Sequence, residues 1–290
     1  MSHNIVITMT SYPARIHNVA RAIHNFLSTQ TVKPNIFYLW LSITEFPNKE
    51  YDLPVELLKI CKYFNIQISW VKDNEYCHKR WYVYPKHFND FVFSIDDDTE
   101  YDPNLIENVI SSEIPEKTIF NIFKDQTYLG IYTGIRLIKY KNATDNSPSI
   151  YKTYLGQCVF PPKTFPLNAF SDKMIELRKK ICPVCDESWF NPFLKYNDIK
   201  IASLDYNQNI IETINNINPT WKTSFSQLYN TFSKQDLQLY IVLRSFPDLF
   251  KKWQKIFPSY IPENDLAKMS IAKLINLYNT TGIFNEKIFN

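Results

Sequence analysis

Four short apolar runs, separated by helix-like segments, constrain the fold of this chain more than any other feature. The runs cover residues 5–9, 36–41, 66–71 and 91–95. They are nearly continuous rather than alternating, which is typical of strands buried on both faces of a parallel sheet. Between them, apolar residues recur at helical spacing, as in residues 16–27 and 53–63. This order predicts an α/β fold with a mainly parallel central sheet and helices on both faces.

The second part of the chain has a less regular pattern. Further strands are expected at 118–123, 153–160 and 199–203, and helices at 170–180 and 187–194, the latter broken or bent at Pro192. After an Asn-rich linker, helix-like segments follow at 224–232, 235–246, 249–257 and 266–278. We therefore predict a catalytic domain over residues 1–205 and a C-terminal α-helical region over residues 206–290.

Composition narrows the class of protein. Apolar residues make up 45% of the chain, enough for a sizeable core, and the net charge of +3 does not by itself argue for nucleic acid as a partner. Five scattered cysteines favour a reducing compartment. There is neither a signal-peptide pattern nor an apolar run of the ~18 residues that a spanning helix needs. The expected location is the cytoplasm.

The C-terminal segment 250–257 is basic and aromatic. One interpretation is peripheral contact with an anionic surface, at the inner face of the cytoplasmic membrane. The alternative is a core-packing helix with its lysines toward water. Formation of a homodimer through the C-terminal region is a third interpretation.

Three consecutive carboxylates, Asp96, Asp97 and Asp98, follow the fourth apolar run. Adjacent like charges resist burial, and a cation would remove that cost. Carboxylate oxygens suit Mg²⁺ or Mn²⁺, and ligands of open α/β sheets gather at the carboxyl ends of strands. The interpretation is a metal-dependent site for a phosphorylated donor. A solvated acidic turn is the alternative.

A second acidic pair, Asp186 and Glu187, lies beside Trp189. Paired acids next to an aromatic residue suit a carboxylate that acts as a general base, whereas the alternative is a helix N-terminus with acids placed favourably on its dipole. Cys182 and Cys185 form a lone CxxC motif, which is a weak signal for zinc.

Two further segments carry groups suited to phosphate. In the loop 10–15, Arg15 is expected to pair with phosphate and Tyr12 to stack on a base, unless this is an ordinary βα loop. The basic triplet 78–80 follows the third apolar run. Its side chains either neutralise a diphosphate or form a solvated helix face.

Taken in order, these pieces resemble bacterial GT-A-type glycosyltransferases of the group that modifies capsule or lipopolysaccharide. The resemblance covers about the first 205 residues. The acids at 96–98 resemble the DxD motif, and 185–189 resembles a D-D-x-W segment with Glu187 at the second acid. Supporting segments are 6–16, with its S-Y-P-A-R-I sequence, 31–34, 39–42, Asp73 with Tyr76 and Lys79, and 156–162. The joint order and spacing of these segments carry the resemblance.

The resemblance implies a metal-dependent transferase that moves a sugar from a nucleoside-diphosphate donor, with UDP favoured, to a hydroxyl of a glycan or lipid-linked glycan acceptor. Asp96 and Asp98 would hold Mn²⁺ or Mg²⁺. Asp186 or Glu187 would be the base, with Asp186 favoured, and Trp189 and Phe190 would contact the acceptor. The implied donor-binding residues are Thr10, Ser11, Tyr12, Arg15, Asp73, Lys79, Asp96 and Asp97.

Transfer with inversion is expected, with retention as the alternative stereochemistry. Two other functions stay open at this point. One is a nucleotidyltransferase on a similar α/β sheet, which usually needs a glycine-rich or basic triphosphate loop that the four glycines of this chain do not form. The other is a non-catalytic protein that binds a nucleotide-sugar or carbohydrate.

Overall fold

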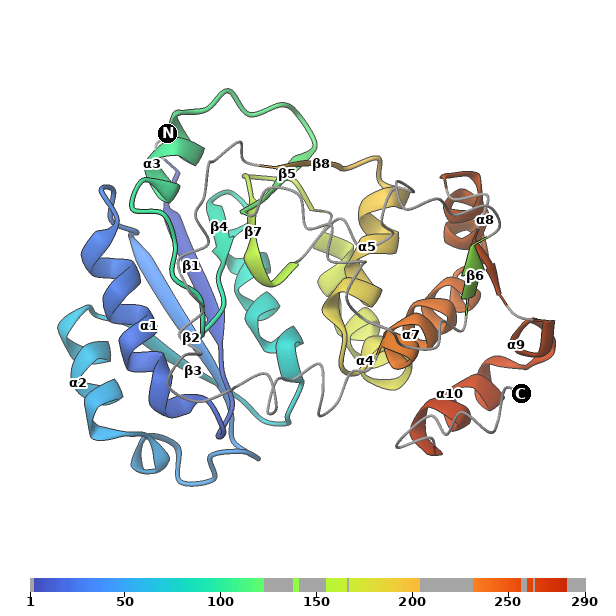
Figure 1. The fold of residues 1–290 in the computed structure, drawn as a ribbon, viewed down its shortest axis with the longest axis horizontal. Coiled ribbons are helices and arrows are strands. Elements are labelled where there is room, and N and C mark those ends of the chain that lie inside the picture. The colour runs from blue at the N-terminus through green and yellow to red at the C-terminus, as the bar shows by residue number, and fades with distance from the viewer. Residues whose placement is uncertain are drawn as a thin grey trace.

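The computed structural model describes residues 3–122, 138–140, 155–165, 167–203, 232–256, 260–262 and 264–280. Its main feature is a seven-stranded sheet with the order β3-β2-β1-β4-β7-β5-β8 (Figure 1). The strands of this sheet are β1 (Ile5–Thr10), β2 (Ile36–Ser42), β3 (Gln67–Val71), β4 (Phe91–Ser94), β5 (Thr118–Asn121), β7 (Cys158–Phe160) and β8 (Lys200–Ser203). A separate two-stranded sheet pairs β6 (Ile138–Tyr140) with β9 (Tyr260–Pro262).

The helices follow the predicted alternation in the first half of the chain. The α-helices are α1 (Ile16–Thr29), α2 (Val55–Tyr63), α3 (Leu105–Ser111), α4 (Asp172–Ile181), α5 (Asp186–Tyr196), α7 (Phe232–Ser245), α8 (Pro247–Ile256), α9 (Asn264–Lys268) and α10 (Ile271–Thr280). Short 3₁₀ segments are η1 (Lys49–Asp52), η2 (Tyr76–His87), η3 (Leu155–Gln157) and η4 (Leu167–Phe170). The predicted mixed α/β architecture is therefore confirmed.

Strand polarity places the acidic cluster next to the first loop. β1 is parallel to both β2 and β4, with Thr8 opposite Ser94 in the register. Because the carboxyl ends of parallel neighbours meet at one edge of the sheet, the loop after β1 lies beside the acids that follow β4. β7 runs antiparallel between β4 and β5, so residues 156–158 also reach this edge.

Both faces of the sheet are buried, as the continuous apolar runs require. Along β1, Val6 belongs to one core, whereas Ile5, Ile7 and Met9 belong to the other, because successive strand side chains point to opposite faces. The second core, which contains Ile5, Ile7 and Met9, includes α1 and α2, and these helices lie on the same side of the sheet in Figure 1. The first core, which contains Val6, includes residues of η2 and extends into the C-terminal helices.

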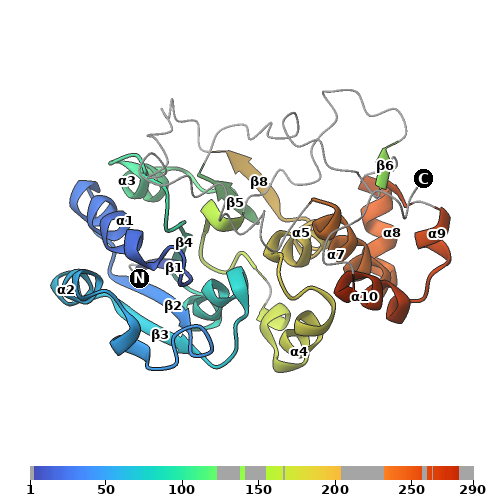
Figure 2. The same ribbon diagram turned by 60° about the horizontal axis from the view of Figure 1, so that its bottom comes forward.

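The C-terminal helices pack against α5. Figures 1 and 2 both place α4, α5 and α7 side by side, and Trp189 of α5 lies 6.1 Å from the ring of Phe246, between α7 and α8. The shared core includes buried residues of α5, α7, α8 and α10. The boundary near residue 205 falls in a part of the chain outside the described residues and stays a prediction, as does the expected helix over 224–231.

Several local predictions need correction. α5 begins at Asp186 and continues through Pro192, where a break or bend was expected. The expected strand 153–160 is a strand only from Cys158, after η3, and the expected helix 266–278 is divided into α9 and α10. The basic residues 78–80 are buried within η2, which rules out the solvated-face interpretation.

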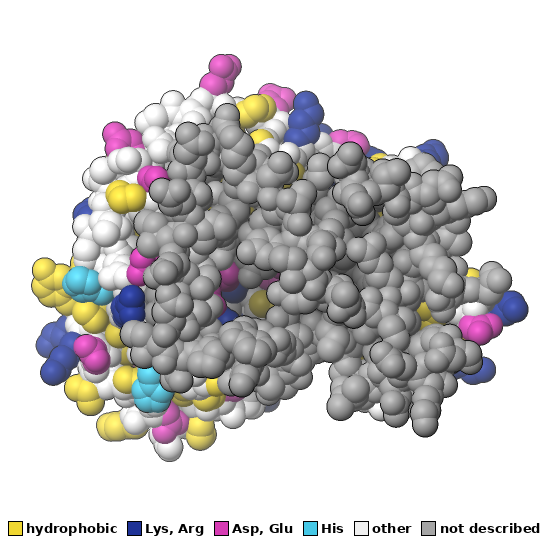
Figure 3. All heavy atoms as spheres, viewed as in Figure 1, with side chains coloured by type: hydrophobic (Ala, Val, Ile, Leu, Met, Phe, Trp, Pro, Cys, Tyr) yellow, Lys and Arg dark blue, Asp and Glu magenta, His cyan; other side chains and the backbone are white. Residues whose placement is uncertain are grey.

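α8 is a core-packing helix. Leu249 and Trp253 are buried, whereas Lys251 and Lys255 are exposed. This corresponds to the alternative in which the lysines face water. In the described part of the chain, no helix is both long and apolar enough to cross a membrane. Figure 3 shows the face of the molecule that is turned to the viewer in Figure 1. Acidic and basic side chains are interspersed on the described part of this face, without a patch of one sign.

Candidate active site

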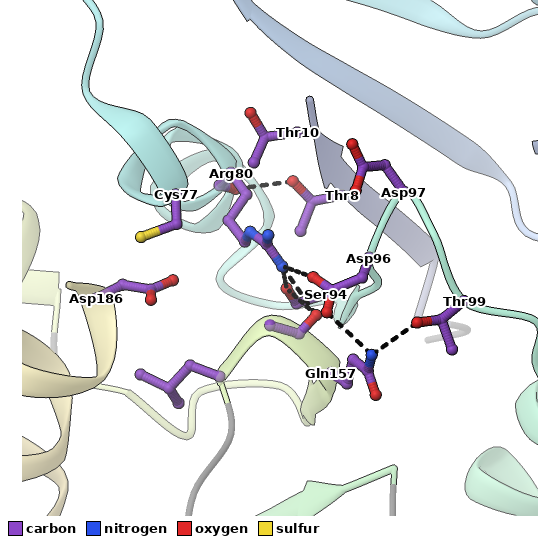
Figure 4. A network of polar contacts seen from close by, with 12 residues as sticks. Thr8, Thr10, Cys77, Arg80, Ser94, Asp96, Asp97, Thr99, Gln157 and Asp186 are labelled. Carbon is purple, nitrogen blue, oxygen red and sulfur yellow. Dashed lines mark hydrogen bonds and ion pairs between the residues drawn. The ribbon is translucent and has the colours of Figure 1, made fainter. Parts of the chain in front are cut away.

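Arg80 lies at the centre of a buried polar network at the carboxyl end of β4 (Figure 4). Its Nη1 atom donates to Asp96 Oδ1 at 3.0 Å, to Ser94 Oγ at 3.1 Å and to the carbonyl oxygen of Gly156 at 2.8 Å. Arg80 and Asp96 are both more than 90% buried. The guanidinium therefore compensates the negative charge of Asp96 inside the protein.

The second oxygen of Asp96 binds the amide of Gln157. Gln157 Nε2 lies 2.9 Å from Asp96 Oδ2 and 3.0 Å from Thr99 Oγ1. The backbone N–H of Asp96 donates to the hydroxyl of Tyr101 at 2.7 Å. Contacts from Arg80 and Gln157 thus fix the carboxylate of Asp96, and Tyr101 fixes its backbone, directly after the apolar strand β4.

Arg15 forms ion pairs with the next two acids, Asp97 and Asp98. Its Nη1 lies 2.8 Å from Asp97 Oδ1 and its Nη2 lies 2.8 Å from Asp98 Oδ2. Ser11 Oγ donates to the other oxygen of Asp97 at 2.5 Å. The guanidinium also lies 5.7 Å from the centre of the Tyr12 ring, in a cation–π contact. Burial alone would lower the pKa of Arg15, but the two carboxylates outweigh it and raise that pKa.

Asp98 has the most exposed side chain of the three acids, at 17%. Burial, together with the charge of Asp97, raises the pKa of Asp98 to about 7 against the opposing effect of Arg15. Its Oδ1 atom accepts one long hydrogen bond, from Thr99 at 3.4 Å. Among the three carboxylates, this oxygen has the most capacity left for a ligand.

The predicted metal fits Asp98 better than Asp96. Both oxygens of Asp96 accept hydrogen bonds, from Arg80 and Gln157, whereas Asp98 is more accessible. Within the described ranges, no three His, Cys, Asp or Glu side chains converge as a metal site. Mg²⁺ is commonly held by one or two carboxylates with substrate phosphates and water completing the shell, and Asp98 meets that requirement.

Lys79 joins the loop after β1 to the loop after β2. Its Nζ atom is 2.8 Å from Glu45 Oε2 and 3.3 Å from the carbonyl oxygen of Ser11, and its side chain is 1% exposed. Burial lowers the pKa of Lys79 despite the charge of Glu45. Thr10 Oγ1 bonds to a backbone carbonyl of β2 at 2.8 Å. Asp73 is exposed and makes no contact with this group in the described residues.

The second acidic pair begins α5. Cys185 precedes the helix, and its sulfur accepts from the backbone N–H of Ser188 at 3.4 Å. Asp186 is 2% exposed, and its Oδ2 accepts from Trp81 Nε1 at 2.8 Å. Burial, the charge of Asp186 and a hydrogen bond to it raise the pKa of Glu187 well above its ordinary value. The raised pKa favours the protonated form of Glu187.

The two acidic groups share one electrostatic environment. Burial raises the pKa of the Cys158 thiol on β7, and the charges of Asp186, Glu187 and Asp96 raise it further, with Arg80 opposing them. Figure 4 shows the Asp186 carboxylate approaching the Arg80 network from α5, on the side opposite Asp97. That Asp96 and Asp186 belong to one functional site stays a prediction.

Trp189 and Phe190 are packed into the core. Trp189 is 1% exposed and lies 5.1 Å from Phe193, ring centre to ring centre, whereas Phe190 is 4% exposed and lies 5.2 Å from Trp81. Neither ring presents an open face to a sugar. The predicted acceptor contacts are not part of this arrangement, because α7 and η2 cover the positions where those rings lie.

Four contributors were missed or left undecided by sequence reasoning: Arg80, Trp81, Gln157 and Glu45. Arg80 was considered only within a basic triplet that would neutralise a diphosphate, and Gln157 lies in the segment that resembles the family but had no assigned role. Their contacts with Asp96 span 16 residues for Arg80 and 61 residues for Gln157. The available signal was the run of three Asp residues, because buried carboxylates need positive charge nearby. This signal indicated a cation but did not identify Arg80 and Arg15 as the residues that supply the charge.

Comparisons with known proteins give distant structural likenesses. No protein-family model and no curated protein matches the sequence. Apo glycosyltransferase GlyE of Streptococcus pneumoniae TIGR4 is 11% identical with a TM-score of 0.40, over 97% of this chain and 64% of that one. Galactosyltransferase LgtC, in complex with donor and acceptor sugar analogs, is 11% identical with a TM-score of 0.40, over 98% of both chains. S. aureus TarS 1-349 is 10% identical with a TM-score of 0.36, over 96% of this chain and 86% of that one.

These likenesses leave the function to be argued from the site. The chain spans 64% of the length of the S. pneumoniae protein. At this identity and these TM-scores, similarity does not assign a reaction or a substrate.

Proposed function

We propose that this protein is a glycosyltransferase that moves a sugar from a nucleoside-diphosphate donor, with UDP favoured, to a hydroxyl of a glycan or lipid-linked glycan, with inversion. The observation that carries this proposal is the pairing of two different acidic groups in one buried network. Arginines compensate the group at Asp96–Asp98, whereas among the described residues the side chain that contacts Asp186 from η2 is the neutral Trp81. The group at Asp96–Asp98 therefore suits binding of a charged donor, and the group at Asp186 suits proton transfer.

The donor would lie at the loop after β1. The Nε–H of Arg15 is buried and lacks a hydrogen-bond partner within the described residues, so this guanidinium has a donor left for phosphate. Ser11 and Lys79 lie in the same group of contacts. We assign Tyr12, which is half-buried beside Arg15, to contact with the base.

The divalent cation would be held by Asp98, with Asp96 and Asp97 fixing the loop around it. When bound, Mn²⁺ or Mg²⁺ supplies a Lewis acid for the leaving diphosphate. Arg15 holds Asp97 and Asp98 in place and adds positive charge next to them. Arg80 holds Asp96 and the η3–β7 segment at fixed positions.

Asp186 would be the general base. Its carboxylate takes the proton of the acceptor hydroxyl, the hydroxyl oxygen bonds to the anomeric carbon, and the bond between that carbon and the diphosphate oxygen breaks with its electron pair on the diphosphate. Glu187 suits this role less well than Asp186, because burial and the charge of Asp186 raise the pKa of Glu187 and so favour its protonated form. A base on the side opposite the donor is the arrangement that inversion requires.

The test is a panel of nucleotide-sugars incubated with Mn²⁺ or Mg²⁺, with release of nucleoside diphosphate as the measurement. We expect turnover with one donor class and its loss in the Asp186→Asn variant. Binding of a nucleotide-sugar without any turnover would favour the non-catalytic function. Release of pyrophosphate from a nucleoside triphosphate would favour the nucleotidyltransferase.

A further inference from the structure

Two consecutive residues of η2 hold the two acidic groups. Arg80 binds Asp96 at 3.0 Å, and Trp81 binds Asp186 at 2.8 Å. Asp96 follows β4 and Asp186 begins α5, so the two acids reach each other's vicinity from elements far apart in the sequence. The two adjacent residues Arg80 and Trp81 therefore link the two acids through one hydrogen bond each.

The dipeptide is itself fixed to the sheet. Thr8 Oγ1, in the middle of β1, donates to the carbonyl oxygen of Arg80 at 2.8 Å, and Thr8 is fully buried. The Trp81 ring packs against Phe160 of β7 at 5.1 Å and against Phe190 of α5 at 5.2 Å. A buried side chain packed against two rings in this way has little rotational freedom, so its N–H points in a constant direction.

An indole N–H is suited to hold a base. It donates a hydrogen bond but accepts none, and it does not titrate, so it orients a carboxylate without competing for the proton that this carboxylate must take. It also satisfies one oxygen of a group that is 98% buried and would otherwise lose its hydration without replacement. The second oxygen remains for the substrate and for Glu187.

We propose that Trp81 is the positioning residue for Asp186, and that with Arg80 it sets the spacing between the donor-side and acceptor-side acids. The reactive role of Asp186 rests on the function proposed above, whereas the positioning contact does not. A catalytic base needs its geometry fixed by neighbouring groups, since small displacements are costly in rate.

The first experiment compares Trp81→Phe with wild type in the transfer assay. Phenylalanine keeps an aromatic ring at this position and removes the N–H together with part of the ring volume. Loss of a hydrogen bond to a charged group predicts a kcat reduced about tenfold to a hundredfold, with donor KM changed less than about threefold.

The matched control is Trp70→Phe. Trp70 Nε1 also donates to a carboxylate, Glu50 Oε1 at 2.9 Å, but it lies on the edge strand β3. The same chemical change there should leave kcat at its wild-type value. If Trp81→Phe keeps wild-type kcat, or if its donor KM rises in step with a lower kcat, the positioning role is wrong.

A second experiment is independent of activity. The chain has six tryptophans, and the indole N–H signals of ¹⁵N-tryptophan-labelled protein report their hydrogen bonds. One signal should be absent in Trp81→Phe, and the same signal should move upfield in Asp186→Asn. An unmoved signal would overturn the contact. If wild type transfers no sugar from any donor, the proposed function fails, and the indole signal still decides whether Trp81 holds Asp186.

Discussion

The acidic group after β4 and the acidic pair at the start of α5 are similar in sequence and different in chemistry. Asp96, Asp97 and Asp98 are joined by ion pairs of 2.8 to 3.0 Å to Arg15 and Arg80. Asp186 and Glu187 have no arginine partner among the described contacts. Cations offset the repulsion within the first group, whereas in the second group the pKa of Glu187 is raised, which favours its protonated form.

This difference shows that the number of acids in a motif does not determine their charge state. Carboxylates next to guanidinium groups suit a site for a charged ligand, because the compensating donors remain after the ligand arrives. A carboxylate held by an indole N–H, beside an acid whose pKa is raised, suits proton transfer. The predictions below test that division, from the largest effect to the smallest.

The largest effect is expected for Arg80→Met. It leaves Asp96 buried without its cation, which predicts a loss of about 3–5 kcal/mol in the free energy of unfolding, measured in urea at pH 7. Arg21→Met is the matched control, because Arg21 is half exposed and 3.7 Å from Glu100, and it should cost at most about 1 kcal/mol. A cost for Arg80→Met as small as that of the control would contradict the compensation of Asp96.

The second effect concerns catalysis. Asp186→Asn should lower the transfer rate by about 10²–10⁴, the usual contribution of a general base, because the amide does not take the acceptor proton. Glu187→Gln removes the neighbouring acid and should keep the rate within about threefold of wild type, since a protonated glutamate and a glutamine are both neutral. Steady-state kinetics at pH 7 measure both, and equal losses would show that the pair does not divide its roles.

The third effect concerns pH and stability. Because the pKa of Glu187 is raised, the native state holds a proton that the unfolded state releases above pH 4.5. The free energy of unfolding should therefore fall as the pH rises from 4.5 toward the native pKa. Urea unfolding from pH 4.5 to 8 should show a smaller fall in Glu187→Gln than in wild type.

The control for this pH series is Glu176→Gln. Glu176 lies on α4, its side chain is 64% exposed, and it contacts only Lys179 in the described structure. Its replacement should leave the fall unchanged. Superimposable pH curves for wild type and Glu187→Gln would mean that Glu187 is not protonated in the native state.

The fold of the first half was predictable because its signals are local. Continuous apolar runs placed β1 to β4 within one or two residues, and helical spacing placed α1 and α2. β7 was harder, since three residues that pair antiparallel between β4 and β5 carry little local pattern. The same limit applies to η2, whose basic side chains are usually exposed and are buried here only because acids and carbonyls from other elements receive them.

The candidate site was predictable in its acids and not in their partners. Asp96 to Asp98 and Asp186 stand out as charges at the ends of predicted elements. Trp81 and Gln157 do not stand out, because the role of an indole or an amide depends on its hydrogen-bond partner. The carboxylates that they bind lie more than 60 residues away in the sequence. The aromatic pair Trp189–Phe190 was placed at the acceptor for its chemistry, whereas packing against neighbouring helices decides its position.

The division between the two acidic groups is tested most directly by calorimetric titration of UDP, with Mn²⁺, into wild type, Arg15→Met and Asp186→Asn, alongside the transfer rate of each. Loss of a charge-assisted contact predicts a Kd raised about tenfold to a hundredfold in Arg15→Met. Asp186→Asn should bind UDP with a Kd within about threefold of wild type while transfer is lost. Equal weakening of UDP binding in both variants, or transfer retained in Asp186→Asn, would contradict the account.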